Sequence, residues 1–357
     1  MLKNFRFLTS GESHGKCLNA IIDGIPAGFS INEEEINSDL KKRQGGYGRG
    51  DRMKIEFDTV EIKSGIRFGK TLGTPICLEI KNKDYQNWEK IMSIFGEETS
   101  EKSFSSPRPG HADFAGAIKY DAKDLRNILE RSSARKTAIT VAIGSIAKQI
   151  LKEFEISTES KIIDIKTKTT EDDIKKLIDE TKASGDTLGG NIEIKISNLP
   201  IGLGSHVQED RKLDGKLAQN LMATPAIKSV EIGLGKECAN KFGSEVHDEI
   251  FIENNKVFRK TNNAGGIEGG MTNGEDIIIK ATMKPIPTLK KSLNTIDFKT
   301  MTQTEAHFER SDTCAVEACA IVLEAKAACV IVDEIFEKFG GDSITEIKRN
   351  YENRKQY

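Results

Sequence analysis

Hydrophobic residues follow two patterns along the chain, one typical of strands and one typical of buried helices. Apolar and polar residues alternate over 54–62, 76–80 and 192–196, as in strands that bury one face, and a strand is also expected over 276–284. Over 137–147 and 313–323 the chain is apolar on every side, as in helices covered all round. Helices are also expected over 33–43 and 209–222. We therefore predict an α+β fold, a layered β-α-β sandwich with buried central helices between antiparallel sheets.

The two halves of the sequence resemble each other weakly. IPAG at 25–28 is followed by LPIG at 199–202, VEI at 60–62 recurs at 230–232, and RS at 131–132 recurs at 310–311. The order is kept, which favours an internal pseudo-repeat with halves of about 1–180 and 181–340. Chance is the alternative, since each match is short. With 357 residues, two subdomains or one large layered domain are both open, and we predict a single domain over 1–357.

Composition limits the classes of function. Lys and Arg number 53 against 55 Asp and Glu, so no global positive field favours a nucleic-acid partner, and an anionic ligand needs local basic clusters. The six cysteines form no CxxC pair, which predicts reduced thiols and no metal site. The N-terminus lacks an apolar targeting segment, and charged residues interrupt the apolar stretch 315–332. We expect a soluble cytoplasmic protein without a membrane span.

Two of the five histidines lie in glycine-bracketed turns that carry polar residues. His14 lies in GESHG at 11–15, and His111 lies in RPGHAD at 108–113. A lone histidine is more often structural than catalytic, but two such loops favour an active site in which imidazoles exchange protons. His206, His247 and His307 lack comparable settings and are expected to be structural.

Arginines and glycines gather in the same kind of segment. The sequence RSSAR at 131–135 is expected to open a buried helix, either as a plain N-cap or as an anion site at the positive end of the dipole. The glycine-rich segment 43–54 is either a surface loop without function or a flap that closes over an anion. Six arginines in motif segments suggest a ligand with several negative charges: Arg43, Arg49, Arg108, Arg131, Arg135 and Arg310.

A glycine cluster, NNAGGIEGG at 262–270, precedes an expected strand and so does not fit a dinucleotide fingerprint. Its glycines make a tight bend or allow backbone to approach a flat ring system. The following KPIPT at 284–288 is a stiff segment with a cation, suited to holding a phosphate or a ring.

Eight segments in this order closely resemble the chorismate synthase family: GESHG, RPGHADF, ERSSAR, GLGSH, VEIG, NAGGIEGG, KPIPT and RSDTC. The resemblance covers nearly the whole chain. It implies a lyase of the shikimate pathway of aromatic amino acid biosynthesis. Such an enzyme converts 5-enolpyruvylshikimate-3-phosphate to chorismate by anti-1,4-elimination of phosphate, with reduced FMN (FMNH2) and no net redox change. It also implies a homotetramer of β-α-β sandwich subunits.

Residue roles follow from the same resemblance. His111 resembles the acid that protonates the departing phosphate, His14 the group that serves the flavin near N1, and Asp312 the carboxylate that helps flavin N5 accept the ring proton. Arg43, Arg49, Arg108 and Arg135 resemble positions that bind the anionic substrate, and Arg43 and Arg49 also match positions assigned to NADP. Flavin contacts are expected at Arg131, Ser132, Ser133, Pro225, Ala226, Gly269, Lys284, Pro285, Ile286, Pro287, Thr288 and Arg310.

Two departures from the family pattern stand near these residues. Lys136 follows Arg135 where a glutamate is common, and Glu130 precedes Arg131 where many members have glycines. Loss of the glutamate removes an acid from a helix N-terminus, and it affects Arg135 only if that acid orients the guanidinium.

Two other functions are weighed against the lyase. A flavin reductase using NADPH is the runner-up, although the sequence shows no added domain and we expect dependence on an outside reductant. A nucleic-acid-binding module built on the glycine-arginine loop is disfavoured, because the net charge is -2 and aromatic residues make up only 6% of the chain.

Overall fold

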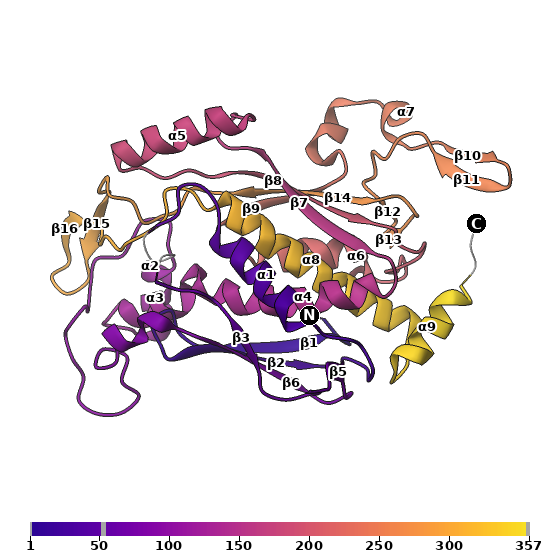
Figure 1. The fold of residues 1–357 in the computed structure, drawn as a ribbon. Helices are drawn as coiled ribbons and strands as arrows, with labels where there is room; N and C mark the ends of the chain where they lie inside the picture. The colour runs from indigo at the N-terminus through magenta and orange to yellow at the C-terminus, as the bar shows by residue number, and fades with distance from the viewer. Residues whose placement is uncertain (1, 51–54, 355–357) are drawn as a thin grey trace.

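Two four-stranded antiparallel sheets form the outer layers of the molecule, and two long helices lie between them (Figure 1). The structure is a computed structural model that describes residues 2–50 and 55–354. Across the first sheet the order is β1 (Arg6–Ser10), β2 (Cys17–Asp23), β6 (Ile76–Lys81) and β3 (Val60–Ile62). Across the second sheet the order is β7 (Ser157–Asp164), β8 (Gly190–Ser197), β14 (Ile277–Met283) and β9 (Ile227–Ile232).

The central helices are α4 (Thr137–Lys152) and α8 (Val316–Phe339), and they pack against each other along their length. Helix α4 contacts β2 and β6 of the first sheet, while α8 contacts β7 and β8 of the second. The two backbones approach closely at Gly144, where an added Cβ would lie 2.3 Å from the Cβ of Ala325. Both helices are buried around most of their circumference, as their uniformly apolar sequences predict.

Shorter elements surround this centre. Helices α1 (Glu33–Gln44) and α6 (Leu213–Met222) pack on the central pair, and α9 (Ile344–Glu352) contacts α8. The remaining helices are α2 (Asp113–Tyr120), α3 (Arg126–Ser132), α5 (Glu171–Ser184) and α7 (Gly243–Val246). Four hairpins complete the described elements: β4 (Ile66–Arg67) with β5 (Lys70–Thr71), β10 (Ile250–Glu253) with β11 (Lys256–Arg259), β12 (Ile267–Glu268) with β13 (Met271–Thr272), and β15 (Asn294–Asp297) with β16 (Thr302–Glu305).

The alternating patterns of β6 and β8 are confirmed. Ile76, Leu78 and Ile80 are fully buried in β6, and the same holds for the three isoleucines of β8 at 192, 194 and 196. These inner faces join the central helices in one hydrophobic core. A second, small core of Phe104, Ala117, Leu125 and Leu129 lies beneath α2 and α3.

The predicted strand over 54–62 is wrong for most of its length. Only Val60–Ile62 is a strand, and residues 51–54 lie outside the described residues. In the segment before it the expected faces are reversed, because Glu56 and Asp58 are buried while Phe57 is 64% exposed. The two carboxylates turn inward because they pair with buried arginines. The attraction between these opposite charges outweighs the cost of leaving the phenyl ring of Phe57 in water.

The expected starts of two helices are also corrected. Arg131 and Ser132 end α3 and do not open α4, which begins at Thr137 after a 3₁₀ turn over Ala134–Lys136. Arg310 and Ser311 likewise precede α8, which begins at Val316. The expected helix over 209–222 divides into a 3₁₀ turn, Glu209–Arg211, and α6.

Helix α8 runs well beyond its predicted end because its buried carboxylates have partners. Asp333 accepts the backbone N–H groups of Lys3, Asn4 and Phe5, at 2.9, 2.6 and 2.9 Å, and so ties the N-terminal segment to the helix. Among the described residues, no helix has the length and apolar character needed to cross a membrane.

Candidate active site

His14 lies in the loop between β1 and β2, with both its backbone and its ring held by one carboxylate. Its backbone N–H donates to Glu130 Oε2 at 2.8 Å, and its Nδ1 lies 2.8 Å from Glu130 Oε1. The imidazole stacks on the ring of Trp88, with centroids 3.8 Å apart and planes 20° from parallel. His14 is buried, with 8% of its surface exposed. The loop histidine therefore has a defined ring position.

The loop that carries His14 is fixed by side chains from distant segments. Arg131 donates to the carbonyls of Gly11 and Thr9 at 3.0 and 2.8 Å, and Asn82 Nδ2 donates to the Gly15 carbonyl at 2.7 Å. Gly11 has φ of +103°, and an added Cβ there would lie 2.3 Å from the Cys17 carbonyl oxygen. Only glycine fits that close approach.

A buried ionic cluster lies behind this loop. Arg135 donates to both oxygens of Asp58, at 2.6 and 2.8 Å, and its Nε donates to Asn82 Oδ1 at 2.8 Å. Arg43 reaches the same carboxylate at 3.4 Å and also donates to Thr137 Oγ1 at 2.9 Å. Burial, only partly offset by Asp58, lowers the pKa of Arg43 to about 10, so it stays protonated at neutral pH. Arg135 is thus oriented without an acid at position 136.

Arg49 and Asp312 form a second pair beside this cluster. The Arg49 Nε lies 3.1 Å from Asp312 Oδ2, and the Gly50 N–H donates to Asp312 Oδ1 at 2.6 Å. The Asp312 side chain is 20% exposed. Residues 45–50 of the predicted flap therefore lie against the irregular segment before α8, where the Gly48 carbonyl accepts the Thr313 N–H at 2.9 Å.

His111 lies at the start of α2 in a third cluster. Its Nδ1 is 2.5 Å from Asp113 Oδ1, and Arg108 donates to the same carboxylate from Nε at 2.7 Å and from NH2 at 3.0 Å. Asp113 is fully buried, which alone would raise its pKa, but the hydrogen bonds from His111 and Arg108 hold the pKa well below its usual range. Asp113 is therefore ionised at neutral pH.

The segment 309–313 contacts residues that neighbour His14, Arg108 and Arg43. Glu309 Oε1 accepts from Arg126 at 2.5 Å, and Arg126 NH1 lies 3.5 Å from Glu130, the partner of His14. Ser311 Oγ donates to the Thr288 carbonyl at 2.6 Å. Asp312 contacts Arg49 as described above. The guanidinium groups of Arg126 and Arg108 also lie over the ring of Phe104, at 5.3 and 5.9 Å from its centroid. Contiguous contacts therefore connect His14 with His111.

The segment expected to hold a flavin on one side lies next to His111. Arg108 NH1 donates to Thr288 Oγ1 at 2.9 Å, and Lys284 Nζ donates to the Gly110 carbonyl. The backbone N–H of Lys284 donates to the Ala226 carbonyl at 2.9 Å, so residues 225–226 also lie next to Lys284. Ala226 has φ of +70°, a conformation that non-glycine residues seldom adopt.

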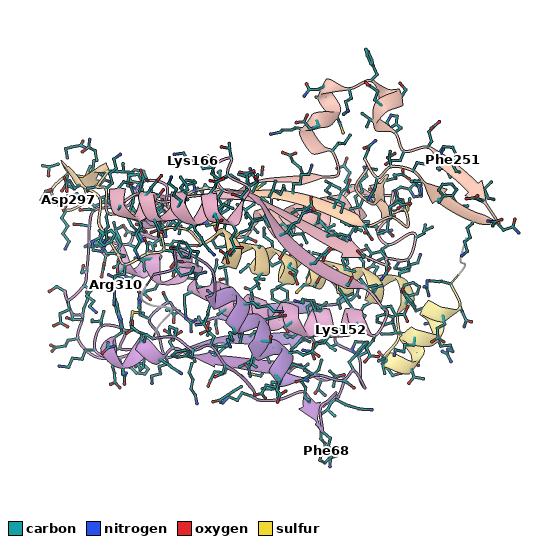
Figure 2. All side chains as sticks on the ribbon, turned by 45° about the horizontal axis from the view of Figure 1, so that its top comes forward. Phe68, Lys152, Lys166, Phe251, Asp297 and Arg310 are labelled. Atoms are coloured by element: carbon teal, nitrogen blue, oxygen red, sulfur yellow. The ribbon has the colours of Figure 1, made fainter. Side chains whose placement is uncertain are left out.

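Four expected contacts have different surroundings. Ser133 Oγ accepts from Ser13 Oγ at 3.1 Å, whereas Ser132 Oγ donates within α3 to the Ile128 carbonyl at 2.7 Å. Arg310 is exposed at the same end of the molecule as Asp297 (Figure 2). Gly269 lies in the β12–β13 hairpin, at the opposite end of the molecule from α2 and α3 (Figure 1). Within one chain, Gly269 does not join the other site residues.

Several residues of the site were not predicted. Asp113 stands inside the RPGHAD motif, and Glu130 was noted only as a departure, so each carried a signal. Asp58, Asn82 and Trp88 carried none, because their importance comes from partners far away in sequence.

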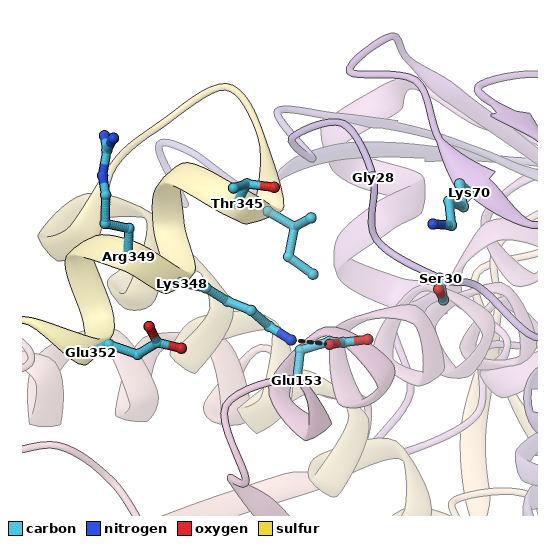
Figure 3. Close-up of a pocket in the computed structure, with 9 residues that line it drawn as sticks. Gly28, Ser30, Lys70, Glu153, Thr345, Lys348, Arg349 and Glu352 are labelled. Atoms are coloured by element: carbon cyan, nitrogen blue, oxygen red, sulfur yellow. Dashed lines mark hydrogen bonds and ion pairs between the residues drawn. The ribbon is translucent and has the colours of Figure 1, made fainter.

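A surface hollow lies elsewhere, between α9 and the end of α4 (Figure 3). It is lined by charged residues that include Lys70, Lys348 and Arg349, and Lys348 donates to Glu153 at 2.6 Å. None of the predicted site residues lines it. Within residues 2–50 and 55–354, no group of three or more His, Cys, Asp or Glu side chains is arranged to hold a metal ion.

Comparisons with known proteins point to one family. A family model described as chorismate synthase matches residues 5–336. The chorismate synthase of Thermoanaerobacter pseudethanolicus is 59% identical over 97% of this chain and 97% of that protein. That of Caldanaerobacter subterraneus subsp. tengcongensis is 54% identical over 99% of each, and that of Aquifex aeolicus is 49% identical over 98% of this chain and 97% of its own length.

A solved structure gives the same answer at the level of the fold. A crystal structure of chorismate synthase superposes with a TM-score of 0.80 at 40% identity, over 99% of this chain and 98% of the other. The match in family model, sequence and structure extends over almost the whole chain, and it includes every segment that supplies the three clusters. This chain belongs to the chorismate synthase family.

Proposed function

We propose that this protein converts 5-enolpyruvylshikimate-3-phosphate to chorismate by anti-1,4-elimination of phosphate, with reduced FMN bound beside the substrate. The family assignment supports the reaction. One structural observation carries the mechanism: each loop histidine has its Nδ1 on a buried carboxylate, Glu130 for His14 and Asp113 for His111, and an arginine pairs with each carboxylate. Two imidazoles held in this way are suited to proton transfer.

The residues of this structure fit a flavin phosphate and ring in part. Burial, together with the positive charge of the neighbouring Lys228, lowers the pKa of Lys284. A bound anion would offset the repulsion between these two ammonium groups. Pro285 to Pro287 form a stiff segment next to Lys284, and Pro225 and Ala226 meet it through the backbone. Lys284, Thr288, Pro225, Ala226, Arg131 and Ser133 are the residues that we propose hold FMN. When bound, reduced FMN supplies N5 as the acceptor of the ring proton.

The chain's own groups divide the remaining work. Arg49 and Arg108 are proposed to bind the anionic groups of the substrate, while Arg43 and Arg135, which both contact Asp58, are proposed to hold this part of the site in place. Asp113 contacts Nδ1 of His111 and is proposed to hold the ring in the position from which it passes a proton to the departing phosphate. Asp312, fixed by Arg49 and the Gly50 N–H, is the carboxylate proposed to assist uptake of the ring proton.

A second assignment of the histidines has support in the structure. His111 lies beside Lys284 and Thr288, the segment proposed to hold FMN, whereas the His14 loop shares Asn82 with Arg135. In this alternative His14 protonates the phosphate and His111 serves the flavin.

The test for both proposals uses the purified protein without oxygen. Phosphate release from the substrate is followed with reduced FMN, and folded wild-type protein that releases none would defeat the reaction. His111→Ala and His14→Ala are each expected to lose most turnover. The variant that also alters the pH-dependent absorption of bound reduced flavin identifies the histidine at the flavin, and the variant that leaves it unchanged identifies the phosphate acid.

We also propose that the sandwich arose by duplication. In each sheet the strands have the order first, second, fourth, third. Thr71 Oγ1 donates to the Pro26 carbonyl and accepts the Phe29 N–H, and Thr272 Oγ1 does the same with Pro200 and Leu203. All four distances lie between 2.6 and 2.9 Å. Such a repeated set of contacts supports a common origin for the IPAG and LPIG segments.

A homotetramer is proposed on two grounds. Leu8 and Ile21 are cross-strand partners on the outer face of the first sheet and are 76% and 44% exposed, as expected where a second subunit covers them. A contact between Gly269 and the FMN held by Lys284 also requires a second subunit. Gly269 precedes β14 and Lys284 follows it, and the seven residues of β14 span about 20 Å.

We propose a cytoplasmic enzyme that obtains its reduced flavin from outside. NADPH is the candidate source of reductant, with Arg43 and Arg49 as the family positions for it. Stopped-flow measurement of NADPH oxidation by the protein with FMN tests this. Rapid oxidation without an added reductase would show that the protein reduces its own flavin.

A further inference from the structure

Glu130 divides its two carboxylate oxygens between the backbone and the ring of a single residue. Oε2 accepts the His14 N–H and Oε1 faces His14 Nδ1, both at 2.8 Å, although the residues are 116 positions apart. The Glu130 side chain is only 3% exposed. A buried carboxylate with both oxygens directed at one histidine does more than cap a loop, because one hydrogen bond to the backbone would suffice for that.

The chemistry of this contact selects one tautomer of His14. An ionised carboxylate only accepts hydrogen bonds, so Nδ1 must carry the proton and the lone pair of the neutral ring lies on Nε2. Trp88 stacks on the face of the ring, so the hydrogen bond and the stacking together fix its rotation and its plane. Nε2 is then the atom that exchanges protons.

We propose that Glu130 is the positioning residue of His14, which holds the Nδ1-protonated tautomer and the ring orientation that proton transfer at Nε2 requires. This inference rests on the proposed function for its kinetic consequence, but the tautomer itself does not depend on it. In metal sites, too, a histidine often donates one ring N–H to a carboxylate, which fixes the tautomer and orients the ring so that the other nitrogen can act.

The charged groups that face this pair come from several segments. Arg126 of α3 lies 3.5 Å from Glu130 Oε1 and 2.5 Å from Glu309 Oε1, which also contacts His307 Nε2 at 3.1 Å. Lys102 lies 3.6 Å from the centroid of the Trp88 ring. Glu130 is the member of this set that touches His14 directly in the contacts described above, so it is the residue to change.

The test compares Glu130→Gln with the wild type. A carboxamide keeps the size of the side chain, but its oxygen accepts only one of the two N–H groups and its NH2 faces the other position. We expect Nδ1 to become an acceptor and the proton to move to Nε2, so that kcat falls about 100-fold. KM for the substrate is expected to stay within about 3-fold, because Glu130 is not proposed to touch the substrate.

Two readouts separate positioning from a merely structural role. Nitrogen-15 NMR of histidine-labelled protein, with His14 assigned from the His14→Asn variant, reports which ring nitrogen is protonated without any turnover. The pH profile of kcat is expected to shift in Glu130→Gln, and Glu130→Asp, which keeps a shorter carboxylate, is expected to recover part of the activity. Glu334→Gln is the matched control, because Glu334 is equally buried but pairs with Lys216 away from the site.

The proposal is overturned if wild-type His14 carries its proton on Nε2, or if folded Glu130→Gln keeps the wild-type kcat. If Glu130→Gln does not fold, the position of the His14 ring proton in the wild type and in Glu130→Asp still tests the proposal. If the wild type releases no phosphate while Nδ1 is protonated, the proposed function fails and the positioning of His14 by Glu130 stands.

Discussion

Asp58 receives hydrogen bonds from two arginine side chains that are themselves buried, and its own side chain is fully buried. A carboxylate in this position neutralises positive charge that would otherwise repel within the protein. The same arrangement recurs where Asp113 meets Arg108 and where Glu130 meets Arg126. At the scale of single residues, the site is therefore built from arginine-carboxylate pairs, and each pair fixes a neighbouring functional group.

Replacing Asp58 by asparagine is expected to destabilise the protein by about 3–5 kcal/mol, because Arg43 and Arg135 would lose the carboxylate that both contact. Of its carboxylate partners, Arg135 would keep Glu56, whose Oε2 lies 3.6 Å from its NH2. Urea unfolding at pH 7 measures the change. The control is Glu61→Gln, whose carboxylate pairs with Lys63 and Lys81 on the surface and should leave the midpoint almost unchanged. Equal midpoints for the two variants would show that the buried pair adds nothing.

Glu309 should make stability depend on acid. Burial raises its pKa, but hydrogen bonds from His307 and Arg126 outweigh burial and lower it to about 2, from 4.5 for the free group. A lowered pKa stabilises the folded state above pH 4.5, and this contribution is lost as the pH falls from 4.5 towards 2. The free energy of unfolding of Glu309→Gln should therefore fall less than that of the wild type over this interval. Parallel curves would contradict the prediction.

At the scale of elements, the contact between α4 and α8 determines how the two layers meet. Gly144 allows the backbones to touch, since a Cβ there would lie 2.3 Å from the Ala325 Cβ and 2.5 Å from its Cα. Neither atom is the end of a flexible side chain. The helices would have to separate to admit even one methyl group, and the inner faces of both sheets would move with them.

Gly144→Ala is accordingly expected to destabilise the protein by about 1–3 kcal/mol, although alanine favours helix formation by up to about 1 kcal/mol over glycine. Gly215→Ala in α6 is the matched control, because the nearest atom there would be 3.8 Å away. Its helix propensity should raise the melting temperature slightly, while Gly144→Ala lowers it. A rise for both variants would show that α4 and α8 tolerate the extra methyl group.

At the scale of the whole molecule, the outer faces of the two sheets differ. On the second sheet Lys161 pairs with Glu193, and Lys195 pairs with Glu159 and Asp276. On the first sheet the exposed Leu8 and Ile21 lie opposite each other. A charged face is suited to water and an apolar spot to a partner, so the proposed subunit contact belongs to the first sheet.

Leu8→Lys is expected to shift the assembly towards smaller species in analytical ultracentrifugation, because a charge would be buried in the proposed interface. Lys195→Glu on the second sheet is expected to leave the sedimentation coefficient unchanged. A wild type that sediments as a monomer would refute the tetramer, and an unchanged Leu8→Lys assembly would move the contact to another face.

Local patterns identified much of the fold and part of the site. The strands over 76–80 and 192–196 were predicted because apolar and polar residues alternate with the period of a strand, and the central helices because their sequences are apolar on every side. The histidine loops, and Asp113 within one of them, were marked by sequence motifs. The reversed faces at Glu56 and Asp58, and the end of α3 at Ser132, were missed because partners from other segments override local preference there.

The sequence by itself determined the family, the segments that carry chemistry and most helices and strands, because these depend on residue order and short-range periodicity. Only the tertiary structure decided which carboxylate each arginine and histidine contacts, and that Gly269 lies far from Lys284 within one chain. His14 and Glu130 are 116 positions apart, whereas His111 and Asp113 are only two apart, so separation along the chain does not identify the partners. The energies of such pairings depend on burial and distance, and neither exists until the chain has folded.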